Sequence, residues 1–172
     1  DKIHDKEFSY FKRNPIIPNT NIYNLIYLLN IFNMKNIAIQ NMSLNITYSE
    51  LMANTLKMSR AFKELGIKKG DIITVCMNNT HQAVATFLAA NKIGAITTFL
   101  NNSASKEEIK NYLNLFESPL FINYNKNIEY NKEIKAATKV KQIITLKKGD
   151  LYTTGLNTIA STPFGYNDML SF

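Results

Sequence analysis

The sequence predicts an α/β fold with a mostly parallel sheet flanked by helices. Four short apolar segments begin at residues 72, 95, 120 and 142, and their spacing matches the length of one short βα unit. The stretches between them carry apolar side chains at helical spacing. Near-continuous apolar strands that alternate with amphipathic helices are typical of a parallel sheet covered on both faces.

The first predicted element is a helix after the breakers Pro15 and Pro18. Its apolar stripe is expected to pack against the domain, in preference to acting as an interfacial anchor. Two short β segments are predicted next, at 37–40 and 44–47, with a turn at 41–43 between them. The helical stripe consists of Ile22, Leu25, Ile26, Leu29 and Phe32.

A longer helix is predicted to begin at residue 47. Thr47-Tyr48-Ser49-Glu50 fits a capping box, in which the Thr47 hydroxyl accepts the Glu50 amide and the Glu50 carboxylate reaches back. Gly66 follows the helix where a left-handed residue is wanted, and 68–71 forms a turn into a strand at 72–76. One face of this helix carries Leu51, Thr55, Met58, Phe62 and Leu65.

The pattern of strand and helix then recurs. Asn79 or Thr80 is expected to cap a helix that stops at Gly94, before a strand at 95–100. Ser105-Lys106-Glu107-Glu108 is a second capping box, and strands at 120–123 and 142–146 flank a helix at about 128–137. The expected apolar faces of the two capped helices are Val84, Phe87 and Leu88, and then Ile109, Tyr112, Leu113 and Phe116.

We expect residues 1–172 to form a single domain with its core at about 20–146. The stretch from 147 to 165 is rich in Thr, Ser, Gly and Lys, which is typical of a surface loop. Residues 147–172 are therefore interpreted as a loop or linker. A chain of 172 residues is long enough to bury a core without disulfides or metal.

Composition and charge exclude several classes of protein. The chain has 20 Lys plus Arg against 13 Asp plus Glu, a net charge of +7, but the basic residues are scattered in pairs. No RNA-binding or zinc-finger pattern accompanies them, so we expect a solvated surface and no nucleic-acid partner. A single cysteine excludes a disulfide framework. With no long apolar run and no secretory signal in residues 1–8, we expect no transmembrane segment and a cytoplasmic location.

The residues alone define no reaction centre, and we predict no catalytic, cofactor-binding or metal-binding residue in this chain. Neither G-x-x-x-x-G-K-[ST] nor G-x-G-x-x-G occurs. Tyr152-Thr153-Thr154-Gly155 offers hydroxyls and a glycine to phosphate oxygens, but no lysine and no helix start follow it. We interpret that segment as an ordinary loop.

Two further side chains, His81 and Cys76, are candidates for a functional role. His81 lies in the first turn of a predicted helix, just beyond the carboxyl end of a strand, where open parallel sheets bind ligands. A helix amino terminus disfavours an imidazolium, however, and no acid or nucleophile has a defined spacing to His81. Cys76 ends an apolar strand and is expected to be a small buried hydrophobe. No group of His, Cys, Asp and Glu has metal-ligand spacing, and His4 lies in a terminus.

Several short motifs occur in a characteristic order. The segment 46–51 (ITYSEL) resembles "(L/I)TY-x-EL", and Ala61-Phe62 followed by 65–71 (LGIKKGD) looks like "A-x-x-L-x-x-x-G-(V/I)-x-x-GD", with the clearest fit at 65–71. The segment 87–95 (FLAANKIGA) is similar to "FLA-x-x-K-x-GA", and 105–113 and 121–122 fit the helix and strand that follow. Over about residues 20–146, this order resembles the amino-terminal part of the adenylate-forming enzymes: acyl-CoA synthetases, peptide-synthetase adenylation domains and luciferases. Two departures from the family pattern affect loop shape. Asn78 stands where the family's "P-N-(S/T)" turn has Pro, and the segment 97–100 ends without the Pro that the family frequently has there.

The resemblance implies the first subdomain of such an enzyme's N-terminal domain, most like an acyl-CoA synthetase. In this family a carboxylate attacks the α-phosphate of ATP with Mg²⁺, and a thiol such as that of CoA then takes the acyl group. The family's "TSG-(S/T)-TG-x-PK" loop, "Y-G-x-TE" motif, ribose-binding Asp and C-terminal lysine come later than this sequence reaches. We therefore expect the isolated chain to be inactive and to bind no ATP, Mg²⁺ or CoA by itself.

Other hypotheses stay open. The chain could be a stand-alone binding module that has lost the chemistry, a structural partner of a separately encoded synthetase, or part of a peptide-synthetase adenylation domain. The expected partners are the remainder of the synthetase and a small carboxylate, with fatty-acid metabolism favoured by the resemblance alone. The substrate-binding residues and the identity of the acid are not determined by this sequence. Apolar surface left uncovered in a partial domain predicts self-association.

Overall fold

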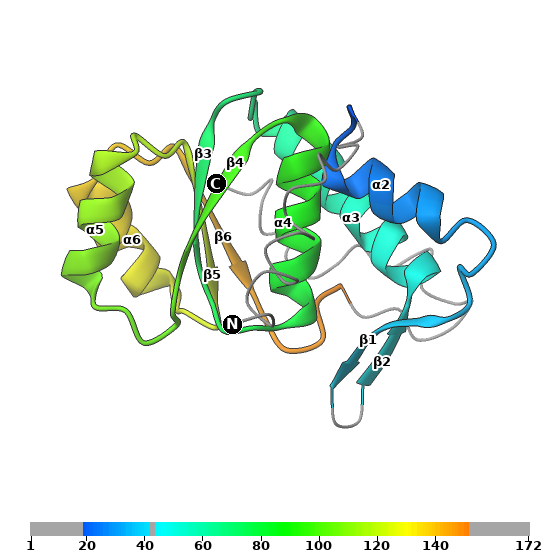
Figure 1. Cartoon of the computed structure of the whole chain (residues 1–172). Coiled ribbons are helices and arrows are strands. Elements are labelled where there is room, and N and C mark those ends of the chain that lie inside the picture. Colours follow the sequence, from blue (N-terminus) through cyan, green and yellow to red (C-terminus); the bar gives the residue numbers. More distant parts are fainter. Residues whose placement is uncertain (1–18, 42–43, 152–172) are drawn as a thin grey trace, which may run out of the picture.

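A four-stranded parallel sheet forms the centre of the chain in a computed structural model that describes residues 19–41 and 44–151 (Figure 1). The strand order is β4-β3-β5-β6, and all three neighbouring pairs are parallel. The predicted α/β class and its parallel sheet are therefore confirmed. The strands are β3 (Ile72–Cys76), β4 (Ile96–Leu100), β5 (Leu120–Tyr124) and β6 (Gln142–Leu146).

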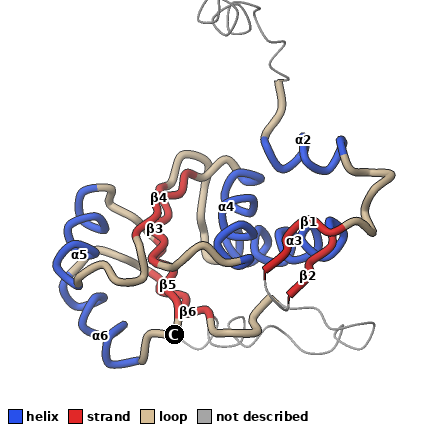
Figure 2. Tube along the Cα trace, turned by 60° about the horizontal axis from the view of Figure 1, so that its bottom comes forward, coloured by secondary structure: helices blue, strands red, loops and turns tan. Residues whose placement is uncertain are grey.

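Helices cover the sheet on both faces. α3 (Tyr48–Glu64) and α4 (His81–Ile93) lie on one face, while α5 (Lys106–Leu115) and α6 (Ile128–Ala137) lie on the other (Figure 1). α2 (Ile22–Leu29) packs against α4 at the outside of the first layer. β1 (Ile37–Asn41) and β2 (Leu44–Thr47) form a separate antiparallel hairpin beside α3 (Figure 2).

The central strand β3 divides the interior into two apolar cores. Because successive side chains of a strand point to opposite faces, Ile73 and Val75 pack in the core beneath α3 and α4. Cys76 belongs to the second core, beneath α5 and α6. All three side chains are fully buried, which is the burial that a central parallel strand requires.

The predicted N-terminal caps are present, but only the first of the two predicted capping boxes has both of its hydrogen bonds. The Thr47 hydroxyl accepts the Glu50 amide and the Glu50 carboxylate accepts the Thr47 amide, which completes the first capping box. Thr80, and not Asn79, is the cap of α4, and Ser105 accepts the Glu108 amide at the start of α5. These local interactions involve groups three residues apart, so they depend little on tertiary packing.

The orientation predicted for two helices is right only in part, since Ile26 of α2 packs against the first core and Leu88 of α4 is buried, as predicted. In α2 the buried side chain is Tyr23, whereas Leu29 and Phe32, two members of the predicted packing stripe, are 69% and 96% exposed. In α4 the buried side is composed mainly of alanines, and Val84 and Phe87 of the predicted apolar face are exposed. Small side chains let α4 approach α3 closely, and Val84 and Phe87 lie on its outer side.

A closed ring of hydrogen bonds joins β5, α6 and β6. Asn123, which is fully buried, donates to the Asn131 Oδ1 at 2.9 Å, and Asn131 donates to the Thr145 Oγ1 at 2.8 Å. Thr145 in turn donates to the Asn123 Oδ1 at 2.8 Å. Each member of the ring therefore satisfies the next, which offsets the cost of burying these polar groups.

Opening this ring should destabilise the chain. Asn131→Ala leaves the buried Asn123 amide without its acceptor, and we expect a loss of about 1–3 kcal/mol in the free energy of unfolding, measured by urea denaturation. The matched control is Asn111→Ala at an exposed position of α5. Because both substitutions make the same gain in helix propensity, equal effects of the two would contradict a stabilising ring.

Candidate functional site

The strand order places a topological switch point at the carboxyl ends of β3 and β5. From β3 the chain passes through α4 to β4 on one side, and from β4 it returns through α5 to β5 on the other side of β3. Open α/β sheets bind ligands in the crevice outside the carboxyl ends of their strands. A ligand site is therefore expected at this edge of the sheet.

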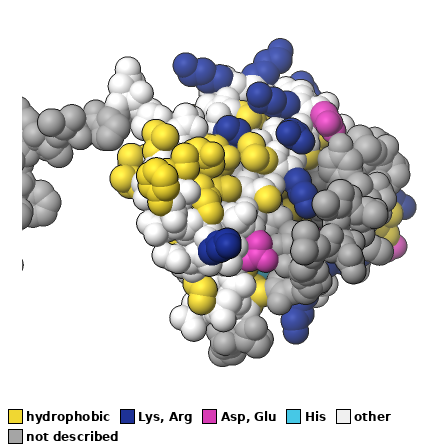
Figure 3. All heavy atoms as spheres, turned by 90° about the vertical axis from the view of Figure 1, so that its right-hand side faces the viewer, with side chains coloured by type: hydrophobic (Ala, Val, Ile, Leu, Met, Phe, Trp, Pro, Cys, Tyr) yellow, Lys and Arg dark blue, Asp and Glu magenta, His cyan; other side chains and the backbone are white. Residues whose placement is uncertain are grey.

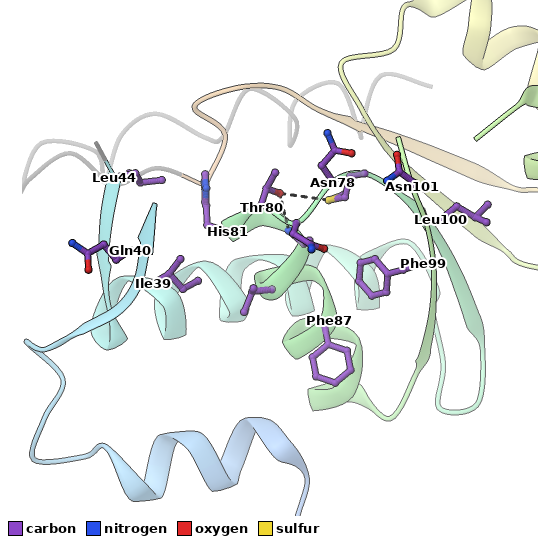
Figure 4. Close-up of a pocket in the computed structure, with 14 residues that line it drawn as sticks. Ile39, Gln40, Leu44, Asn78, Thr80, His81, Phe87, Phe99, Leu100 and Asn101 are labelled. Atoms are coloured by element: carbon purple, nitrogen blue, oxygen red, sulfur yellow. Dashed lines mark hydrogen bonds between the residues drawn. The ribbon is translucent and has the colours of Figure 1, made fainter. Parts of the chain in front are cut away.

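A pocket of about 900 Å³ lies at the carboxyl ends of β3 and β4, beside the switch point and without a lining residue from β5 (Figure 4). Its walls come from the β1–β2 hairpin, from the turn between β3 and α4, and from the end of β4. Phe87 of α4 and Phe99 of β4 lie on one side, and Leu44 and Ile39 of the hairpin lie on the other (Figure 4). Its remaining walls are Gln40, Met77, Asn78, Asn79, Thr80, His81, Ala83, Val84, Leu100 and Asn101.

Among the residues that the structure describes, no lysine, arginine or carboxylate lines this pocket. Its polar groups are side-chain amides, the Thr80 hydroxyl and the His81 imidazole. The other side chains that line it are apolar. Apolar walls with a few polar groups are typical of a site for a small organic molecule. A triphosphate would need cations that these walls do not supply.

Thr80 anchors the rim of the pocket. Its side chain accepts the amide of Ala83 at 3.2 Å and contacts the Met77 sulfur at 3.9 Å (Figure 4). Thr80 has an extended backbone and is followed directly by α4, as a β-to-helix transition requires. The turn after β3 is thereby held by the first turn of the helix that follows it.

His81 and Gln82 hold the segment that leaves β6. The His81 Nε2 lies 3.2 Å from the Asp150 carbonyl oxygen, and the Gln82 Nε2 donates to the carbonyls of Lys147 and Asp150 at 3.3 and 3.2 Å. From α3, the Asn54 Nδ2 donates to the Leu151 carbonyl at 2.5 Å. Residues 147–151 are thus fixed by side chains from two helices, so the beginning of the predicted loop has a defined place.

Burial lowers the pKa of His81. Its imidazole is half-buried, and the loss of hydration disfavours the charged form, while the bond to the Asp150 carbonyl acts weakly in the opposite direction. The side chain is therefore neutral at pH 7. This environment agrees with a positioning role for His81 and supplies no positive charge to the pocket.

Three buried polar residues, Asn54, Gln82 and Asp150, were not among the side chains predicted to have a role. Asn54 and Gln82 are each less than 4% exposed, and Asp150 is buried as well. The position of Asn54 beside the apolar stripe of α3 could have predicted a buried hydrogen bond, because a polar residue that is buried needs a partner. That partner is almost a hundred residues away, at Leu151, and periodicity within one helix cannot reveal it.

Cys76 is a buried hydrophobe, as predicted. Burial raises the pKa of its thiol, and the Sγ lies 3.3 Å from the Asn101 carbonyl oxygen. It packs in the core beneath α5 and α6, whereas His81 lies on the α4 side of the sheet. The structure does not bring these two groups together as a nucleophile and base.

The remaining predictions concern metal sites, membrane spans, the location of the protein and its partners. Among residues 19–41 and 44–151, no three His, Cys, Asp or Glu side chains are placed to hold a metal ion. In that same part of the chain, no helix is long and apolar enough to cross a membrane. Tyr152-Thr153-Thr154-Gly155 and His4 lie outside the described residues. The cytoplasmic location, the single domain and the lack of a nucleic-acid partner stay predictions.

These features define an α/β unit with a pocket at the carboxyl edge of a parallel sheet. A family model described as "AMP-binding enzyme" matches residues 33–164. The chain therefore belongs to the AMP-binding, or adenylate-forming, superfamily, and it represents the N-terminal part of such enzymes. The resemblance seen in the motifs is confirmed.

The relatives are acid–thiol ligases. Acetyl-coenzyme A synthetase from Coprinopsis cinerea is 33% identical over 103 residues, which are 60% of this chain and 15% of the relative. The 4-coumarate–CoA ligase CCL1 from Humulus lupulus is 38% identical over 64 residues, 37% of this chain and 12% of the relative. Coronafacic acid ligase from Pectobacterium brasiliense shares the fold, with a TM-score of 0.69 and 22% identity over 89% of this chain and 30% of that chain.

Acidification should destabilise the chain through His81. Its folded pKa lies below the unfolded value of about 6.5, so the unfolded state binds the proton more readily. The stability contributed by His81 is complete above about pH 6.5 and is lost as the pH falls through the folded pKa. Thermal unfolding between pH 7.5 and 5 should therefore show a larger fall in Tm for the wild type than for His81→Gln. An NMR titration giving an imidazole pKa at or above 6.5 would contradict this expectation.

Proposed function

We propose that this chain is the N-terminal part of an ATP-dependent acyl-CoA synthetase. In the whole enzyme, a carboxylate would attack the α-phosphate of ATP to form an acyl-adenylate and release pyrophosphate. The CoA thiol would then displace AMP to form a thioester. The family match over residues 33–164 carries this proposal. The relatives favour CoA as the acceptor over a carrier protein, because they are named acetyl-CoA synthetases and a CoA ligase.

The chain spans 15% of the Coprinopsis cinerea relative, so most of the enzyme would lie outside it. The 172 residues contain no "TSG-(S/T)-TG-x-PK" segment, and the described residues that line the pocket include no lysine or arginine. Charge that develops on a transferring phosphate needs such donors. ATP and Mg²⁺ would therefore be held by the remainder of the enzyme.

The pocket suits the organic part of a substrate. Phe87, Phe99 and Val84 offer apolar contact to an acyl or aromatic group, and the neutral His81 adds no charge. We assign to the pocket the role of one wall of the acyl site. The groups that bind ATP, Mg²⁺ and CoA and that contact the reacting atoms would belong to the remainder of the enzyme. Fatty-acid metabolism stays part of the proposal, since no pocket residue selects a particular acid.

The isolated 172-residue chain should not catalyse adenylation. With Mg²⁺, ATP and acetate or a longer carboxylate, we expect exchange of labelled pyrophosphate into ATP at the level of a no-protein blank, because the phosphate-binding groups are missing. A complete acetyl-CoA synthetase serves as the positive control. Exchange above the blank by the purified chain would contradict the expected inactivity.

The protein translated from the native reading frame past Phe172 tests the parent function. We expect it to contain the lysine-bearing phosphate loop, to exchange pyrophosphate when a carboxylate is present, and to form a thioester with CoA. A stop codon directly after Phe172 would overturn the proposal. Saturable binding of an acyl compound or nucleotide to the 172-residue chain would then favour the stand-alone binding module.

A further inference from the structure

A contiguous apolar surface lies on α2 and on the turn that follows it. We call this surface the α2 patch, and Figure 3 shows hydrophobic side chains gathered on this side of the molecule. Leu28 is 61% exposed, Leu29 69% and Phe32 96%. Single exposed apolar residues are ordinary, but a contiguous group of this kind marks an interaction surface. The α2 patch consists of Ile22, Tyr27, Leu28, Leu29, Ile31 and Phe32.

α2 is held to the rest of the domain by its opposite side. Tyr23 is buried, its amide donates to the Asn91 Oδ1 at 3.2 Å, and the Lys92 Nζ lies 4.2 Å from the centre of its ring. These contacts with α4 orient the helix and direct Leu28 and Leu29 outward. The exposure of the patch is therefore a consequence of how α2 is anchored.

The apolar surface continues along α4. Val84 and Phe87, which are 39% and 36% exposed, precede Asn91 by seven and four residues. Residues at these spacings share one side of a helix. Because Asn91 contacts α2 and the other two residues line the pocket, the exposed apolar side of α4 runs from α2 to the pocket.

The charge pattern favours a protein partner over a membrane. α2 has no acidic residue in its first turn and no basic residue in its last turn, and residues 19–41 contain one lysine, Lys35, and no carboxylate. Helices that bind at a lipid surface carry a polar face rich in Lys and Arg. An uncharged apolar helix of eight residues instead resembles one side of a protein core.

We infer that the α2 patch is the docking surface for the remainder of the AMP-binding domain in the same polypeptide. This inference rests on the proposed function, because it requires such a remainder. The chain corresponds to 30% of the coronafacic acid ligase chain, so a body larger than this chain is available to cover the patch. The family match begins at residue 33, so α2 itself lies outside it and its role follows from this structure alone.

Hydrogen exchange followed by mass spectrometry tests the docking. The 172-residue chain is compared with the protein translated from the native reading frame past Phe172. We expect the amides of α2 to exchange at least about 10-fold more slowly in the longer protein, because docking suppresses local opening. The triple variant Leu28→Ser, Leu29→Ser, Phe32→Ser should restore fast exchange of α2 in the longer protein and change little in the shorter one.

The matched control is Leu115→Ser, since Leu115 is 73% exposed on α5, on the other face of the sheet. It should leave the exchange of α2 unchanged in both proteins. Equal exchange of α2 in the two lengths, or the same effect from the control, would overturn the inference. It would also be overturned if the triple variant abolished dimerisation of the longer protein in light scattering, or its binding to vesicles of anionic lipid.

The same longer protein separates this inference from the proposed function. Carboxylate-dependent pyrophosphate exchange without protection of α2 would overturn the docking alone. Protection of α2 that the triple variant removes, without pyrophosphate exchange, would overturn the proposed function alone. A reading frame that stops at Phe172 would overturn both.

Discussion

The burial of β3 on both faces is the constraint on which the rest of the structure depends. A central parallel strand has no solvent-facing side, so Ile73 and Val75 need one helical layer while Thr74 and Cys76 need another. α4 must therefore follow β3 on one face, and α5 and α6 must cover the other (Figure 1). The strand order β4-β3-β5-β6 results from chain connections that change face once, between α4 and α5, and it sets the switch point at the carboxyl ends of β3 and β5.

The first turn of α4 connects the pocket with the segment that leaves the sheet. Thr80 and His81 line the pocket, while His81 and Gln82 contact the backbone of residues 147–151. Leu151 adopts a φ of +60°, an uncommon backbone conformation for a leucine, and its carbonyl accepts the Asn54 amide. The surrounding side chains thus hold the outgoing chain in a conformation that local propensity disfavours. In a larger enzyme, this arrangement would fix where the following segment begins relative to the acyl site.

The distribution of apolar surface agrees with a partial domain. Two buried cores are complete around β3 and β5, so the described part of the chain has the interior of a folded unit. At the same time Phe32, Leu29 and Phe87 are exposed, and so is Phe99 at the end of the sheet formed by β4. A family member that spans 15% of one relative would lack neighbours that bury such surface in the complete enzyme. The exposed apolar surface is therefore compatible with membership of the AMP-binding superfamily.

The sequence by itself determined the order and type of the elements, the capping box of α3 and the family. These depend on residues three or four apart, or on motifs of about ten residues, and Thr47 with Glu50 is the clearest case. Only the tertiary structure decided which sides of α2 and α4 are buried, because both sides of each helix carry apolar side chains and periodicity alone cannot rank them. It alone brought Asn54 and Gln82 to residues 147–151, and it closed the ring of Asn123, Asn131 and Thr145. Contacts across 65 to 97 residues arise from the stacking of α3 and α4 on the sheet, a relation between elements that no single segment encodes.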